Sequence, residues 1–184
     1  MLFRSPDMTS PYAFFQFWVN ADDRDVMTLV RTFTFRDSDE IAALQAATDQ
    51  QPHARQAQRT LARDVTTLVH GAHHAAQAEA AAHALFGQGE LRDLDAATLD
   101  AAMSEAPHAD LPTGEGMSVA ELLVACGLVT SNGAGRRAIN EGGVSINNVR
   151  VESEDYQVSA DDFLHGRWLV LRRGKRTFGG IRKP

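Results

Sequence analysis

The chain contains 184 residues, of which 43% are hydrophobic and 23% charged, a balance that is ordinary for a globular protein and excludes disorder throughout. No stretch approaches the roughly 20 apolar residues of a membrane span, and no cationic region followed by an apolar signal core opens the chain, so we expect a cytoplasmic protein. Cys126 is the single cysteine and lies in an apolar run, which excludes a disulfide within the chain and favours a buried core residue over a nucleophile.

The start of the chain predicts a helical bundle. Ser10 followed by Pro11 is typical of a capped helix, which we expect to run to residue 20. This helix contains five aromatic side chains that need burial, namely Tyr12, Phe14, Phe15, Phe17 and Trp18. Asp22 and Asp23 can cap a second helix, and a third, short helix is expected to start at Ser38.

The bundle is predicted to continue to residue 106. Apolar spacing indicates three further helices, over residues 52–70, 74–86 and 95–105. Residues 107–116 contain two prolines and two glycines with little apolar content, which predicts a linker. The expected organisation is therefore α+β, with an all-α bundle over residues 1–106, a linker over 107–116 and a small α+β module over 117–184.

The module over residues 117–184 opens with two short capped helices. Ser118 is the expected N-cap of the first, which ends at Gly127; Ser131 or Asn132 caps the second, which ends at Gly142. A tight hairpin should follow, because β-branched residues flank the pair Asn147 and Asn148. We expect this turn to be the loop that touches a ligand.

Charge distinguishes this module from the rest of the chain. Residues 117–184 contain 10 basic and 7 acidic residues, a net charge of +3, whereas residues 1–116 have a net charge of −9. No acidic residue occurs between Arg167 and Lys183. This segment is therefore expected to attract a polyanion; a solvated cationic edge strand is the plainer interpretation.

The sequence offers little for catalysis or metal binding. His70, His73 and His74 lie close together, but Gly71 interrupts the helix and no cysteine or carboxylate completes a ligand set. Paired carboxylates such as Asp161 and Asp162 lie where caps and turns are expected. No glycine-rich phosphate loop or nucleophile elbow is present, so we predict no catalytic residue and no metal site.

Four segments resemble bacterial tyrosyl-tRNA synthetases in the same order along the chain. They are TSPYAFFQFWVNADDRDV at residues 9–26, ARQAQRTLARDVTTLVHG at 54–71, ALFGQGEL at 84–91 and DFLHGRWLVLRRGKR at 162–176. The resemblance implies that the helical part is an anticodon-binding domain. It also implies that the last part is an S-four-type domain, named for small-subunit ribosomal protein four, and that both bind tyrosine tRNA.

The family's catalytic Rossmann-like domain has no counterpart in this sequence. Neither its His-Ile-Gly-His-like motif nor its Lys-Met-Ser-Lys-Ser-like loop is present, so we expect the chain to be unable to activate tyrosine alone. ATP and magnesium are implied only for that domain. The family dimerises through it, so the resemblance implies a monomeric or weakly associating fragment, made naturally or by truncation.

Twelve residues of the module are predicted to bind RNA. Arginine forks and helix amides favour phosphate oxygens, and asparagines contact sugars or base edges unless they only adopt positive φ in the turn. The twelve are Ser131, Asn132, Arg136, Arg137, Asn147, Asn148, Arg150, Arg167, Arg172, Arg173, Lys175 and Arg176.

Three alternatives remain open at this stage. A stand-alone S-four-type protein acting on ribosomal RNA would use the same basic module, although the aromatic segment at residues 9–20 favours the synthetase. A DNA-binding helix-turn-helix over residues 118–141 would need base-reading side chains, and the second helix offers little besides its arginine pair. A purely protein-binding bundle would bind no nucleic acid at all.

Overall fold

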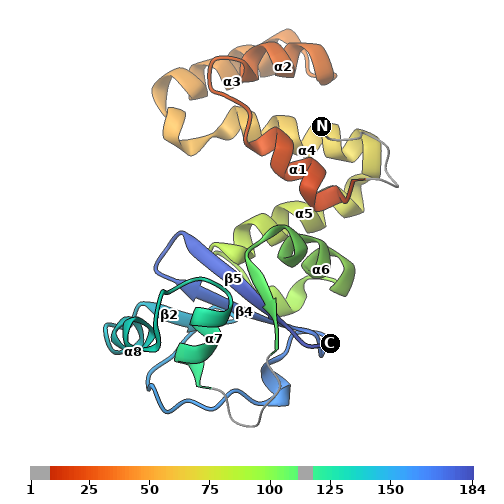
Figure 1. The fold of residues 1–184 in the computed structure, drawn as a ribbon. Helices are drawn as coiled ribbons and strands as arrows, with labels where there is room; N and C mark the ends of the chain where they lie inside the picture. The colour runs from red at the N-terminus through yellow and green to blue at the C-terminus, as the bar shows by residue number, and fades with distance from the viewer. Residues whose placement is uncertain (1–8, 112–117) are drawn as a thin grey trace. The chain divides into compact units, whose positions relative to one another are not determined.

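A computed structural model describes residues 9–111 and 118–184, and these residues form eight α-helices and one five-stranded sheet (Figure 1). The chain divides into two compact units, Met1–Ala82 (unit 1) and His83–Pro184 (unit 2). The predicted α+β class is confirmed. The division falls within helix α5 (Ala72–Leu85), whereas the sequence placed the boundary at residues 107–116.

Unit 1 is built around a central helix. Its other elements are α1 (Pro11–Val19), α2 (Val26–Phe33), α3 (Ser38–Gln50), the 3-10 turn η1 (Pro52–Ala54) and the first part of α5. Helix α4 (Gln56–His70) contacts α1, α2 and α3. Its buried face, which includes Leu61 and Val65, packs against Phe14, Phe15 and Val30 in one apolar core.

Local hydrogen bonds decide where these helices begin. The Ser10 side chain accepts from the Ala13 amide at 3.1 Å, which confirms the first predicted cap. The predicted cap of the second helix is wrong, because Asp25 precedes α2 and Asp22 and Asp23 lie before it. The third helix, α3, begins at Ser38 as predicted, and Asp37 caps it in a reciprocal pair with Glu40.

The helix predicted over residues 52–70 is shorter in the structure. Arg55 adopts a left-handed conformation with φ of 51°, so η1 and α4 are separate elements. The Arg55 guanidinium donates to the carbonyl oxygens of Val19 and Ala21 at 2.9 and 3.1 Å. These bonds tie the end of α1 to the start of α4 and account for the strained backbone at Arg55.

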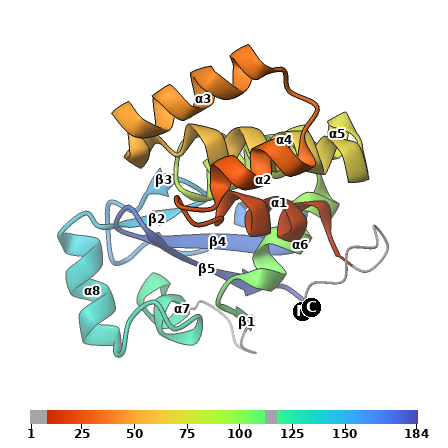
Figure 2. The same ribbon diagram turned by 90° about the horizontal axis from the view of Figure 1, so that it is seen from above.

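Unit 2 contains the sheet, whose strands lie in the order β1-β5-β4-β2-β3. The strands are β1 (His108–Asp110), β2 (Val144–Ile146), β3 (Val149–Arg150), β4 (Trp168–Arg173) and β5 (Thr177–Arg182). Figure 2 shows β3, β2, β4 and β5 side by side. The helical elements are the end of α5, η2 (Leu91–Asp93), α6 (Ala96–Glu105), α7 (Val119–Ala125), α8 (Asn132–Asn140) and η3 (Ala160–Asp162). Strand β4 is therefore a central strand, which does not fit the alternative of a cationic edge strand.

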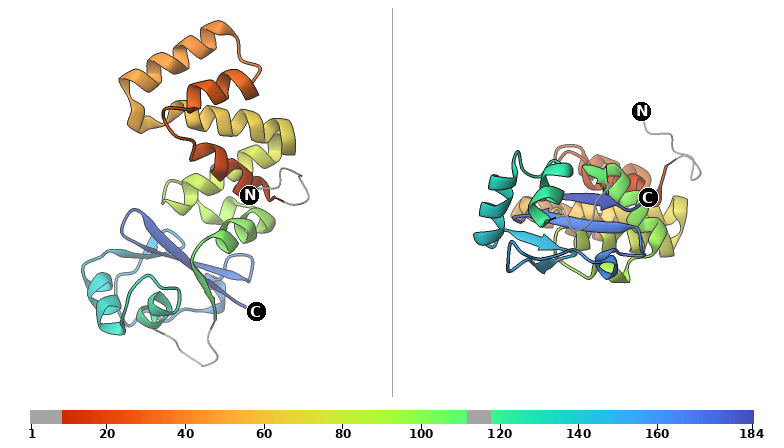
Figure 3. Two further views of the ribbon diagram at one scale, coloured as in Figure 1. Left: turned by 45° about the horizontal axis from the view of Figure 1, so that its top comes forward. Right: turned by 60° about the horizontal axis from the view of Figure 1, so that its bottom comes forward.

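The two faces of the sheet are covered by different segments. Leu169 and Leu171 of β4 belong to the core that α7 and α8 complete. Figure 3 shows these two helices, in green to cyan, beside the blue strands. The alternate residue Trp168 faces α6 and donates its indole N–H to Asp100 at 2.9 Å. A two-residue alternation along β4 thus separates the two layers.

Strand β1 lies inside the segment predicted to be a linker. It pairs in parallel with β5, and Arg182 of β5 binds the Asp110 carboxylate at 2.7 Å. The guanidinium holds the pKa of Asp110 below its usual range. Residues 107–111 thus bond to β5, and the rest of the predicted linker, 112–116, lies outside the described residues.

Among the helices of the described residues, none combines the length and apolar character that crossing a bilayer requires.

We expect Gly179→Ala to destabilise unit 2. A Cβ at this position would lie 2.8 Å from the carbonyl oxygen of Pro107, which precedes β1, so backbone must move. The free energy of unfolding should fall by about 1–3 kcal/mol in urea denaturation followed by circular dichroism. Gly133→Ala on α8 is the matched control, because no atom lies within 4 Å of its added Cβ. An unchanged Gly179→Ala midpoint would contradict the close approach.

Candidate nucleic-acid interface

Helix α8 turns its arginine pair outward because its inner face packs tightly on α7. A Cβ on Gly135 would lie 3.0 Å from the Cα of Ala120, so the two helices approach at this glycine. Ala138 and Ile139 are buried on the same face. The intervening positions, Arg136 and Arg137, are therefore exposed, as helical periodicity requires.

Arg136 and Arg137 form no hydrogen bond or ion pair within the described part of the chain. Hydrogen bonds from Ser118 lower the pKa of Glu121 on α7, and the charge of Arg136 lowers it further. Two guanidinium groups are thus presented to solvent on adjacent positions of one short helix. Each offers a planar fork of N–H donors that fits a phosphate.

Three further cations lie around the C-terminal end of α8. The Arg150 guanidinium lies directly over Gly142, which follows the helix with φ of 70°. The Gly174 amide donates to the Gly143 carbonyl at 2.7 Å. The turn between β4 and β5 therefore begins next to the C-terminal end of α8. That turn contains Lys175 and Arg176, both exposed.

We use the term open cations for Arg136, Arg137, Arg150, Lys175 and Arg176. Within the described residues none of the five forms a hydrogen bond or ion pair. Cations near the end of a helix are favoured by its dipole, and here they also converge from three chain segments. The arrangement suits the binding of a polyanion backbone through several phosphates.

The other predicted cations are bound within unit 2. Arg167 pairs with Asp100 at 3.2 Å. The Arg172 guanidinium lies over Gly87 and donates to the Phe86 carbonyl at 3.1 Å, and Arg173 donates to the Leu128 carbonyl at 3.1 Å. These side chains hold the segments around the sheet together, which leaves them less available to an RNA than the open cations.

Both asparagines of the predicted ligand loop are also committed to the fold. They adopt left-handed φ values of 47° and 67°, which confirms the two-residue hairpin turn. Asn147 donates to the Asp162 carbonyl at 2.5 Å and accepts from the Val170 amide at 3.0 Å. Asn148 donates to the carbonyls of Ala84 and Gly89 at 2.7 and 3.0 Å.

The remaining predicted site residues lie at the start of α8. Ser131 caps the helix by accepting from the Ala134 amide at 3.3 Å, and Asn132 is exposed in the first turn. Sequence reasoning placed Gly142 at the end of a helix but did not connect Gly87 or Gly142 with the arginines that lie over them, Arg172 and Arg150. A glycine directly after a helix predicts a positive φ, which both adopt.

Among the described residues, no three His, Cys, Asp or Glu side chains are placed to hold a metal ion. Burial raises the pKa of the Cys126 thiol, which keeps it protonated. The geometry that unit 2 presents is one for binding.

Comparison with known proteins identifies the family in two parts. Residues 1–87 match the model for class I tRNA synthetases (W and Y), and residues 98–181 match the tyrosine-tRNA ligase SYY-like C-terminal domain. Tyrosine-tRNA ligase of Mycobacterium tuberculosis is 53% identical over 182 residues, which are 99% of this chain and 43% of that protein. The enzyme of Corynebacterium glutamicum is 50% identical over 180 residues, 98% of this chain and 43% of that protein.

Both family models thus describe parts of class I aminoacyl-tRNA synthetases. The chain belongs to the tyrosine-tRNA ligase family and corresponds to the C-terminal part of its members. It spans less than half the length of the curated relatives it matches. A solved structure of a C-terminally truncated Aspergillus nidulans mitochondrial tyrosyl-tRNA synthetase is 33% identical, covers 41% of this chain and 22% of that one, and has a TM-score of 0.40.

Asn147 has two structural roles, because its side chain forms two hydrogen bonds and its backbone adopts a positive φ. Two substitutions should separate these roles. Asn147→Ala removes two hydrogen bonds and places a Cβ residue without a polar group at positive φ, so unfolding should require about 3 kcal/mol less. Asn147→Gly restores the backbone freedom and should lose about 2 kcal/mol. Urea denaturation measures both. Equal stability of all three proteins would show that the bonds contribute nothing.

Unit 1 should lose stability in mild acid because of His70. Its ring packs edge to face on Phe14 at 5.0 Å, and its Nε2 has no partner among the described residues. Burial first, and His74 second, lower its pKa below the ordinary 6.5. The unfolded chain then binds the extra proton, so stability falls as pH drops below 6.5. His70→Asn should flatten this dependence between pH 7.5 and 5.5 in thermal denaturation; an unchanged slope would assign it to other groups.

Proposed function

We propose that the chain is the tRNA-binding portion of a tyrosine-tRNA ligase and that unit 2 binds the backbone of tyrosine tRNA through the open cations. The observation that carries this proposal is the arginine pair on α8, which is exposed and has no partner within the described residues. It lies in the region that matches the tyrosine-tRNA ligase C-terminal domain.

The helical segment is proposed to contact the anticodon region of the same tRNA. The match of residues 1–87 to class I synthetases supports this role. Attachment of tyrosine, with its ATP and magnesium, belongs in this proposal to the part of the relatives that this chain does not match. We propose further that the chain acts in the cytoplasm and is monomeric or weakly associating alone.

A stand-alone protein acting on ribosomal RNA is the second candidate. Such a protein would use the same open cations but would prefer ribosomal RNA to tyrosine tRNA. Identity of 50–53% with tyrosine-tRNA ligases along 98–99% of the chain favours the synthetase.

Binding to tyrosine tRNA, to a tRNA with a short variable arm and to duplex DNA across a salt series tests the proposal. Arg136→Ala with Arg137→Ala should weaken binding of tyrosine tRNA roughly 10- to 100-fold and reduce the slope of log K against log salt by about 1.5, since two phosphate contacts are lost.

Arg136→Lys with Arg137→Lys is the matched control, because it keeps both charges and should retain most of the salt slope. Circular dichroism establishes that each variant is folded. Equal weak binding of all three nucleic acids would reduce the site to a nonspecific basic surface. Unchanged binding by the double alanine variant would reject α8 as the contact.

A further inference from the structure

Phe86 and Phe178 form an exposed aromatic pair in unit 2, and we use the term aromatic pair for these two residues. Phe86 lies directly after α5 and is 45% exposed, and Phe178 lies on β5 and is partly exposed. The two rings contact each other edge to face, with a centroid distance of 5.5 Å and an interplanar angle of 89°. Two adjacent rings at the surface offer a flat ligand an aromatic face to stack on.

The segment that carries Phe86 is fixed on two sides. Arg172 donates to the Phe86 carbonyl at 3.1 Å, and its guanidinium lies over Gly87, which has a φ of 80°. Asn148 of the hairpin turn donates to one carbonyl before Phe86 and one after it, at 2.7 and 3.0 Å. Because this backbone is already ordered, a ligand that stacks on the ring loses little free energy to ordering of the segment.

The strand register places cations on the same face of the sheet as Phe178. Phe178 is opposite Arg172, which in turn is opposite Ser145. Ser145 is opposite Arg150 on β3. Residues directly opposite each other point to the same face, so one row crosses the four strands that lie side by side in Figure 2.

Positive charge predominates around the aromatic pair. Lys175 and Arg176, two of the open cations, lie in the turn that leads into β5, within three positions of Phe178. Three segments meet here, namely residues 83–90, 141–152 and 172–178, and they contain five cations and three acids. The cations are Arg150, Arg172, Arg173, Lys175 and Arg176, and the acids are Glu90, Glu141 and Glu152. A polyanion is therefore attracted to this face.

An aromatic surface with cations beside it fits a nucleobase. Every base has a π face that stacks on an aromatic ring, and the phosphates that follow it along the strand bind cations. A base inside a duplex already stacks on both of its neighbours, so the base that stacks on a protein ring is an unpaired one. An apolar peptide would use the rings but would leave the cations without a partner.

We propose that Phe86 stacks on an unpaired base of the RNA that unit 2 binds, and that Phe178 supports the ring from the side. Lys175 and Arg176 bind the phosphates next to that base. Asn148 and Arg172 are positioning residues, because they hold the segment that carries Phe86. The stacking contact deepens the proposed function and rests on it, since it requires that unit 2 binds tRNA.

Phe86→Leu tests the stacking contact, because it keeps an apolar side chain and removes the aromatic face. Binding of tyrosine tRNA to the full chain should weaken about 5- to 100-fold. The slope of log K against log salt should stay unchanged, because a neutral ring releases no counterions. Phe86→Trp should bind as tightly as the unmodified chain, since an indole also stacks on a base.

Phe86→Trp also gives a direct signal of stacking. An indole that stacks on a base loses fluorescence, so tyrosine tRNA should quench this variant more than the unmodified chain, whose two tryptophans are buried. Tyr156→Leu is the matched control, because Tyr156 is an aromatic residue of unit 2 that is 40% exposed and lies outside the row. It should leave the affinity unchanged. Urea denaturation establishes that each variant is folded.

The outcomes separate the stacking contact from the proposed function. Unchanged affinity of Phe86→Leu, together with weaker binding by Arg136→Ala with Arg137→Ala, would reject the contact and leave the proposed function standing. No binding of tRNA by the unmodified chain would reject both. A fully paired RNA duplex that loses as much affinity as tyrosine tRNA on Phe86→Leu would contradict an unpaired base. A dimer that Phe86→Leu abolishes, with tRNA affinity unchanged, would assign the aromatic pair to a protein contact.

Discussion

The alternation of side chains along β4 is the constraint on which unit 2 depends. Successive residues of a strand point to opposite faces of the sheet. In β4 this directs Trp168 and Arg172 toward α6 and the end of α5, and Leu169, Leu171 and Arg173 toward α7 and α8. Because β4 lies between β5 and β2, both of its edges are paired, and Arg172 and Arg173 bond to segments on opposite faces of the sheet.

These hydrogen bonds and ion pairs divide the cations of unit 2 into two groups. Residues 83–116 fold with the basic module and contain seven acidic residues and one arginine, and two of those acids pair with Arg167 and Arg182. The positive charge of the β4–β5 region is therefore partly neutralised within the unit. The cations that remain available to a polyanion lie along α8 and at its C-terminal end. There, Arg136, Arg137 and Arg150 have no acid bonded to them in the described residues.

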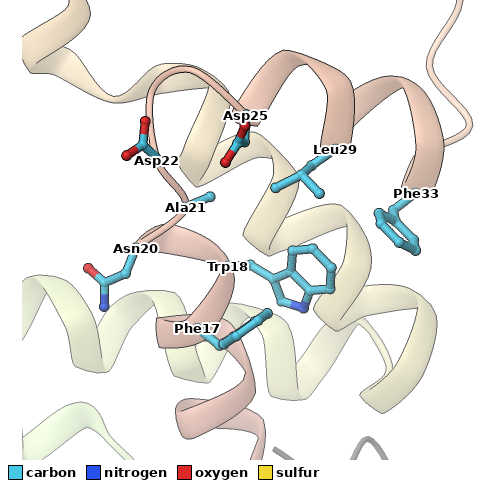
Figure 4. A pocket seen from close by; sticks show the side chains of 8 residues that line it. All are labelled: Phe17, Trp18, Asn20, Ala21, Asp22, Asp25, Leu29 and Phe33. Carbon is cyan, nitrogen blue, oxygen red and sulfur yellow. The ribbon is translucent and has the colours of Figure 1, made fainter. Parts of the chain in front are cut away.

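Unit 1 offers a surface of the opposite character. Its groove between α1 and α2 has aromatic walls and an acidic end (Figure 4), whereas the α8 face presents arginines.

The sequence by itself determined the fold class, the family and most local elements. The caps Ser10, Asp95 and Ser118 are hydrogen bonds between residues three apart, and the Asn147–Asn148 turn is set by φ preferences of adjacent residues. Such signals act over a few positions and are readable in the chain. The arginine pair of α8 faces solvent by helical periodicity alone.

Only the tertiary structure decided which polar groups remain available. Asn148 and Ala84 are 64 positions apart, and Arg172 and Phe86 are 86 positions apart. No local sequence pattern therefore indicates that the donors of Asn148 and Arg172 are already hydrogen-bonded within the fold. The same holds for Gly179 against Pro107, which turned part of the predicted linker into a strand of the sheet. The physical reason is that a hydrogen bond or close contact between distant segments depends on where the folded chain places those segments. Composition and residue spacing do not predict such a contact.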